Sequence, residues 1–167
     1  MKLFTLLVLW FFIISCVEEN SDYSVMIYDG NTIDSVFLQK CNIPEKAIIS
    51  GYLFAYANEC SSEKEVVKCD ILNFLSIENE CDENHISFLK GWFSEDIMVK
   101  IKLLNCPNLP SDGVIQNTIK SIELKRKKDT IKIRMHVTGL NNSQEKTWDI
   151  NQTHAYLIKN NTFISLN

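Results

Sequence analysis

An alternation of apolar and polar residues is the strongest pattern in the C-terminal half of the chain. Ile122 and Leu124 alternate with charged residues, Asp129-Thr130 has the composition of a turn, and apolar residues recur at every second position over 131–137. Because a period of two sends successive side chains to opposite faces of a sheet, this stretch predicts an antiparallel hairpin. Shorter patterns of the same kind predict strands at 99–103, 148–150, 154–158 and 162–166.

Helical spacing of apolar residues dominates the middle of the chain instead. Spacings of three and four predict a helix over Pro44–Asn58, and Ser62–Glu65 fits a capping box that begins a second helix. Asp82 is expected to cap a third helix near residues 85–93.

Two short segments precede these helices. Tyr23–Tyr28 is apolar and is closed by the turn dipeptide Asp29-Gly30, which predicts a strand. Ile33–Leu38 fits either a return strand or a short helix capped by Asn31, because periodicity does not separate the two over so short a stretch.

These elements predict an α+β domain over residues 23–167. Two or three N-terminal helices are expected to pack on one face of a C-terminal antiparallel sheet of four to five strands. A chain of this length can bury a substantial core. The order of elements resembles cystatin-like and NTF2-like folds by analogy only, since no sequence motif carries the resemblance.

The N-terminal residues have the pattern of a separate targeting segment. Lys2 is followed by an almost unbroken apolar run, Leu3–Ile14, and then by Ser15 and Cys16. The run fits the apolar region of a signal peptide, roughly 7 to 15 residues, and is shorter than the roughly 20 residues that span a membrane. Ile13-Ile14-Ser15-Cys16 resembles the lipobox of bacterial lipoproteins. The resemblance implies removal of residues 1–15 and attachment of a diacylglycerol and an acyl chain such as palmitate to Cys16.

The polar residues that follow the cysteine suggest a tether. Residues 16–22 lack apolar periodicity and include Glu18, Glu19 and Asp22, so they predict a solvated linker between lipid and domain. They also resemble the acidic stretch of surface-exported lipoproteins of the Bacteroidota. The expected location is the bacterial cell envelope, as an outer-membrane or surface lipoprotein held in the membrane by its N-terminal lipid. An ordinary signal peptide would instead give a secreted protein.

Five cysteines are left if one of the six carries the lipid. At most two intramolecular disulfides can then form, and the sequence leaves their connectivity open. Antiparallel packing of the first two helices would bring Cys41 near Cys81, which is the preferred pair; Cys60 with Cys106 is the second pair considered. A bond between Cys69 and Cys81 is disfavoured if a helix separates them, because their Cα atoms would lie beyond about 7 Å.

One basic cluster stands out in a chain of net charge −4. Lys125-Arg126-Lys127-Lys128 are consecutive, and Lys132 and Arg134 follow across the predicted hairpin. Such a cluster suits anionic lipid headgroups, lipopolysaccharide phosphates or an acidic protein partner. The alternative is a solvated hairpin tip whose charge discourages edge pairing. Aromatic residues do not interleave the cluster, so no nucleic-acid partner is expected.

Local motifs for catalysis, cofactors or metals are missing from the sequence. His85, His136 and His154 are dispersed, and the acidic stretch Glu78–Asn84 lacks the glycine and closing glutamate of an EF-hand. We therefore expect a non-catalytic, lipid-anchored envelope protein, without cofactor or metal, that binds a ligand or a protein partner. The alternative is an envelope inhibitor of the immunity type that neutralises a toxin or a hydrolase.

Overall fold

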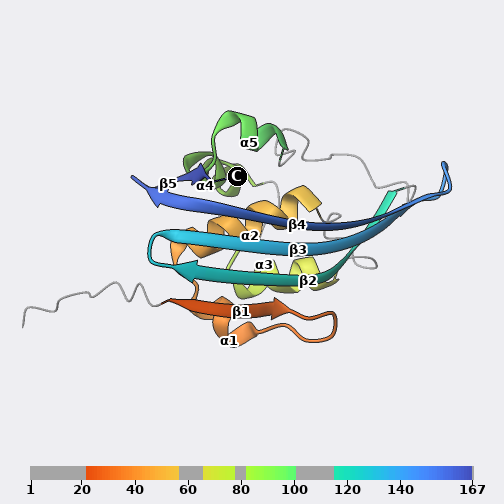
Figure 1. Cartoon of the computed structure of the whole chain (residues 1–167), viewed down its shortest axis with the longest axis horizontal. Helices are drawn as coiled ribbons and strands as arrows, with labels where there is room; N and C mark the ends of the chain where they lie inside the picture. Colours follow the sequence, from red (N-terminus) through yellow and green to blue (C-terminus); the bar gives the residue numbers. More distant parts are fainter. Residues whose placement is uncertain (1–21, 57–65, 78–81, 101–114, 167) are drawn as a thin grey trace, which may run out of the picture.

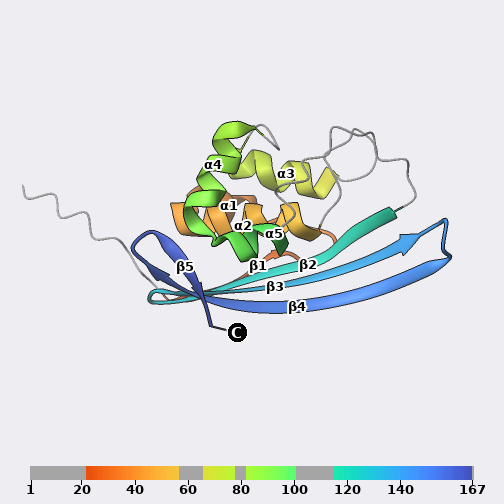
Figure 2. The same cartoon turned by 90° about the horizontal axis from the view of Figure 1, so that it is seen from above.

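The computed structural model describes residues 22–56, 66–77, 82–100 and 115–166. In this part of the chain, five helices lie on one face of a five-stranded antiparallel sheet (Figure 1, Figure 2). The strands are β1 (Tyr23–Tyr28), β2 (Ile115–Lys127), β3 (Thr130–Asn141), β4 (Lys146–Lys159) and β5 (Thr162–Ser165). The helices are α1 (Ser35–Lys40), α2 (Ile43–Tyr56), α3 (Val66–Phe74), α4 (Glu83–Trp92) and α5 (Glu95–Lys100).

The strands lie in the sheet in the order β1-β2-β3-β4-β5, and every neighbouring pair is antiparallel. β1 precedes all the helices in the sequence but pairs with β2, so the whole helical segment is an excursion between two neighbouring strands. The sheet curves, and the helices occupy its concave side (Figure 2). We call this the inner face and the opposite side the outer face; the latter carries none of the described helices.

Most predicted elements are present, and the predicted α+β class is confirmed. β1 has the predicted bounds, and α2 and α4 lie where the apolar spacing predicted helices. Asp82 caps α4 as expected, because its Oδ1 accepts a hydrogen bond from the backbone N–H of Asn84 at 2.7 Å. The ambiguous segment after β1 is a helix, α1, and its cap is Asp34 rather than Asn31.

The strand predicted at 99–103 is wrong over its first two residues. Val99, the first residue of the expected 99–103 strand, belongs to α5, and 101–103 lie outside the described residues. Glu95 and Asp96 occupy the first turn of α5, where negative charge favours the helix dipole, and this local preference outweighs a short alternating pattern. The capping box at Ser62–Glu65 also lies outside the described residues.

The predicted hairpins are confirmed, and β2, β3 and β4 are longer than the sequence suggested. The expected strands at 148–150 and 154–158 are one continuous strand, β4, because β3 pairs with it from end to end. Lys128 in the β2–β3 turn has φ 52°, and Asn160 and Asn161 in the β4–β5 turn have φ 51° and 57°. Asn tolerates this left-handed conformation well, which suits it to such turns.

The core lies between the inner face of the sheet and the helices. Ile122 and Leu124 of β2 and their β3 neighbours are buried, as the alternation predicted. α2 contacts both β3 and α4, and it buries Ile48 and Leu53 completely. The hydroxyl groups of Tyr52 in α2 and Tyr156 in β4 lie 2.6 Å apart, so the polar ends of these buried side chains satisfy each other.

The expected Cys41–Cys81 disulfide is not formed. Cys41 is a buried free thiol at the C-cap of α1, where its charged neighbours are Asp34, Glu45 and Lys46. Cys69, which neither preferred pair included, is disulfide-bonded. Cys60, Cys81 and Cys106 lie outside the described residues, so the expected Cys60–Cys106 pair stays a prediction. The sequence argument failed because Cys41 lies in the tight corner between α1 and α2 and packs into the core there.

Candidate functional site

A groove opens at one end of the sheet, which we call the tip end. Here β1 begins beside the last residues of β2, and the β2–β3 turn lies against the end of β4, since Ile158 N donates a hydrogen bond to Asp129 O at 2.7 Å. The cavity has a volume of about 680 Å³, within the roughly 300 to 1,000 Å³ of ligand pockets. We call it the tip groove. It is lined by Ile43, Pro44, Lys46, Leu75, Ser76, Ile77, Phe88, Gly91, Trp92, Arg126, Asp129, Ile158 and Asn161.

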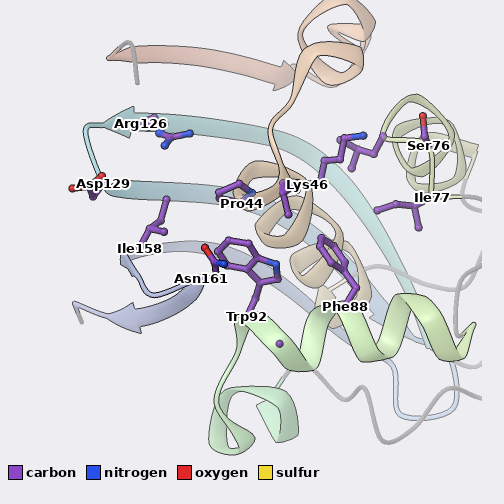
Figure 3. Close-up of a pocket in the computed structure, with 13 residues that line it drawn as sticks. Pro44, Lys46, Ser76, Ile77, Phe88, Trp92, Arg126, Asp129, Ile158 and Asn161 are labelled. Atoms are coloured by element: carbon purple, nitrogen blue, oxygen red, sulfur yellow. The ribbon is translucent and has the colours of Figure 1, made fainter. Parts of the chain in front are cut away.

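Aromatic and aliphatic side chains make up most of the wall of the tip groove. Figure 3 shows Phe88 and Trp92 projecting from α4 toward the groove, with Ile158 and Pro44 farther along it. Trp92 also packs on the sheet, because the centroid of its ring lies 4.8 Å from that of Phe163 in β5. Trp92 therefore packs on the core while it lines the groove.

A buried ion pair forms the other side. Arg126 of β2 lines the groove, and its Nη1 donates to Glu45 Oε1 of α2 at 2.6 Å. Glu45 is only 2% exposed and also accepts hydrogen bonds from Tyr23 Oη at 2.8 Å and from the backbone N–H of Asn42. The Arg126 Nε donates to the carbonyl oxygen of Lys128 at 3.1 Å. These bonds clamp β1, β2 and the first turn of α2 together.

The same carboxylate suppresses ionisation of its neighbours. Burial raises the pKa of Tyr23 well above its usual value, and the charge and hydrogen bond of Glu45 add to the effect. Burial likewise raises the pKa of the Cys41 thiol to about 12, again with help from Glu45. Since the thiolate is the nucleophilic form of cysteine, Cys41 is an inert core residue at neutral pH.

Gly91 leaves a gap in the wall of the tip groove. A Cβ built at this position of α4 would meet no other atom within 4 Å. Its two neighbours in α4 differ from it: Trp92 is buried, and Lys90 is exposed but does not line the groove. Gly91 is therefore a position from which a larger side chain can fill the groove without disturbing the core.

The predicted basic cluster is divided between the two faces of the sheet. Arg126 points inward to Glu45 and is buried, so it is not part of an exposed patch. Lys125 and Lys127 are exposed on the outer face, where Lys132 and Arg134 of β3 join them. Lys128 lies in the turn itself. The signal for this split was present in the sequence, because Arg126 follows Ile122 and Leu124 in the inward-facing series.

The three histidines lie in different surroundings and do not form one site. His136 Nε2 lies 2.8 Å from Asp149 Oδ1 on the outer face. His154 stacks near Tyr156 with ring centroids 6.4 Å apart, and His85 packs edge-on against Phe54 at 5.1 Å. In the described part of the chain, no three His, Cys, Asp or Glu side chains are grouped so that they could hold a metal ion. None of the described helices is long and apolar enough to cross a membrane.

Sequence reasoning did not find the tip groove. Its lining comes from five separate stretches of the chain that meet only in the folded state. The one local signal was the pair Trp92 and Phe93, both of which are buried. No protein-family model, curated protein or solved structure matches this chain.

Proposed function

We propose that the chain is a lipid-anchored, non-catalytic protein of the bacterial cell envelope that binds a ligand or protein partner in the tip groove. The observation that carries this proposal is the groove itself: an apolar cavity of about 680 Å³ with Lys46, Arg126 and Asp129 among its lining residues. A mostly apolar concavity with a few charged groups is the usual form of a binding site.

The position of the groove supports the anchoring part of the proposal. Asp22, the first described residue, accepts a hydrogen bond from the backbone N–H of Lys128 at 2.9 Å, so the chain enters the domain at the tip end. Cys16 lies outside the described residues, six positions before Asp22. At about 3.3 to 3.6 Å per residue, an extended tether of this length reaches roughly 20 Å. A lipid on Cys16 would hold the tip end close to the membrane.

The chemistry of the lining supports binding rather than catalysis. A hydrolytic site needs a nucleophile with an adjacent base, or a pair of carboxylates with separated roles. The groove instead offers one hydroxyl group, Ser76, together with Lys46, Asp129 and an arginine already engaged by Glu45. These groups can orient a bound molecule by hydrogen bonds and charge.

An envelope inhibitor that covers a toxin or hydrolase is the second candidate. The observation that favours a protein partner is Ile43, an apolar residue at the groove that is 62% exposed. Exposed apolar side chains beside a cavity are typical of surfaces that bury a partner residue.

The finer fold assignment, a cystatin-like or NTF2-like order of elements, is also a proposal. It rests on the order of elements: a single N-terminal strand, then the helices, then four strands.

Filling the groove tests the binding proposal. Gly91→Phe should reduce binding of the fluorescent probe anilinonaphthalene sulfonate by roughly tenfold, the equivalent of about 1.4 kcal/mol, because the new ring occupies the cavity. Lys90→Phe adds the same ring to an exposed position on the same helix and serves as the control. Equal binding by both variants and the parent chain would reject the tip groove as a binding site.

The anchor has a separate test. Intact-mass analysis of the protein from a bacterial membrane fraction should find an N-terminus at Cys16 that carries acyl mass. In Cys16→Ser the acyl mass should be absent. A mature chain that begins at another residue, or that lacks acyl mass at Cys16, would refute the anchor and leave the groove proposal standing.

A further inference from the structure

The outer face of the sheet near the tip end is amphipathic. Cross-strand neighbours share a face, so the register defines three adjoining rows of outward side chains, of which the third holds Glu123, Arg134 and Thr153. One row runs from Lys127 through Thr130 and Leu157 to Ile164, and the next holds Lys125, Lys132 and Ala155. We call this surface the amphipathic outer face; its basic half is Lys125, Lys127, Lys132 and Arg134, and its apolar half is Leu157, Ile164 and Leu166.

The basic half carries charge that the protein itself does not neutralise. Lys125 and Lys132 lie directly opposite each other on β2 and β3, an arrangement of like charges that destabilises a sheet. Glu123 bonds to Lys125 at 2.9 Å, and this contact is the main reason that the pKa of Glu123 is lowered. Among the described residues, neither Lys127 nor Lys132 forms an ion pair. One acid among four cations leaves three positive charges in excess.

The apolar half is exposed beside these cations. Ile164 is 45% exposed and Leu166 is 53% exposed, although both are large apolar residues. Ile164 pairs with Leu157, and Leu166 N donates to the carbonyl oxygen of Ala155 at 2.9 Å, so these side chains adjoin the lysine rows. Lysines that flank exposed aliphatic side chains match the two layers of a membrane surface, anionic headgroups and the acyl boundary beneath them.

We propose that the amphipathic outer face binds an anionic lipid bilayer and so sets the orientation of the domain on the membrane. This inference rests on the proposed anchor for its biological setting, because the tether enters at Asp22, which is bonded to the β2–β3 turn. The reach of the tether, roughly 20 Å or about two to three Debye lengths at physiological salt, lets the lysines approach the headgroups. A soluble acidic protein would satisfy the lysines but leaves the exposed aliphatic half without a role.

The experiment measures vesicle binding by the full chain carrying Cys16→Ser, which lacks the lipid, and compares it with binding by surface variants of the same chain. The quantity measured is the ratio of partition coefficients onto vesicles of phosphatidylcholine mixed with phosphatidylglycerol and onto phosphatidylcholine alone. This ratio cancels any contribution from the apolar leader and does not depend on lipidation. Each lysine near an anionic surface contributes about fivefold to binding, so Lys125→Gln/Lys127→Gln/Lys132→Gln should lower the ratio by about a hundredfold.

A second triple variant keeps the net charge change constant. Lys40→Gln/Lys90→Gln/Lys146→Gln removes three exposed lysines from other parts of the described surface and should leave the ratio within about fivefold of the parent. Ile164→Ser/Leu166→Ser should weaken binding to the mixed vesicles while leaving all the lysines in place. Equal ratios for the two lysine variants would overturn the proposal. Tight binding to soluble polyglutamate without binding to mixed vesicles would also overturn it, in favour of an acidic protein partner.

Discussion

The buried ion pair between Glu45 and Arg126 should be a sensitive polar contact in the described part of the fold. Arg126→Met removes the guanidinium and leaves the Glu45 carboxylate, 2% exposed, with hydrogen bonds from Tyr23 and Asn42 only. Breaking a buried pair by removing one partner typically costs about 3 to 5 kcal/mol, because a charge is left uncompensated in a poorly solvated site. Small domains have a total stability of about 5 to 15 kcal/mol, so this loss is a large share.

Urea unfolding of four chains measures the effect: the parent, Arg126→Met, Glu45→Gln and the double variant. The double variant should recover much of the loss, since replacing both partners removes the unpaired charge. Lys125→Met is the matched control on the outer face, where the pair with Glu123 is partly exposed and should contribute less than about 1 kcal/mol. The reasoning is refuted if Arg126→Met costs no more than Lys125→Met, or if the losses from the two single variants simply add.

Three further predictions concern stability. The pKa of Cys41 rises on folding from 9.0 to about 12, so its contribution to stability is complete below pH 9 and is lost as the pH increases toward 12. Cys41→Ala should reduce the slope of this alkaline decline in the free energy of unfolding, measured with urea, by up to about 1.4 kcal/mol per pH unit. Parallel curves for the parent and the variant would contradict the assignment. A Cβ at Gly139 would overlap the indole of Trp148, which lies across the glycine and donates to Asn117 Oδ1 at 2.9 Å. Gly139→Ala should therefore lower the free energy of unfolding by about 1 to 3 kcal/mol and change the tryptophan fluorescence. Gly91→Ala, whose Cβ meets open space, should instead raise the free energy of unfolding by up to about 1 kcal/mol.

The strands and turns of the C-terminal sheet were predictable because their determinants are local. Alternation over 131–137 reflects the geometry of a strand with one buried face, and Asn160-Asn161 supplies the positive φ that a two-residue turn requires. The 99–103 segment shows the limit of this reasoning. A few alternating residues fit a strand, yet Val99 follows an acidic first turn and belongs to a helix.

The buried network was partly visible in the sequence. Arg126 stands two positions after Leu124, in phase with the core residues of β2, and this phase indicates an inward side chain. Its partner was not predictable, because Glu45 lies 81 positions away and meets it only after β1 pairs with β2. The Cys41–Cys81 prediction was wrong for a related reason: the two residues stand 40 positions apart, and the corner between α1 and α2, not local spacing, sets where Cys41 lies.

By itself the sequence determined the α+β class, the strand periodicity, the cap of α4 at Asp82 and the hairpin turns, since each depends on neighbours a few residues apart. It also carries the N-terminal pattern from which the proposed lipid anchor comes. Only the tertiary structure decided that Arg126 pairs with Glu45 and that five separate stretches enclose the tip groove. It likewise decided that lysines and exposed aliphatic side chains share one outer face. The physical reason is that packing and charge pairing depend on distances in space, and the register of β1 to β5 sets those distances.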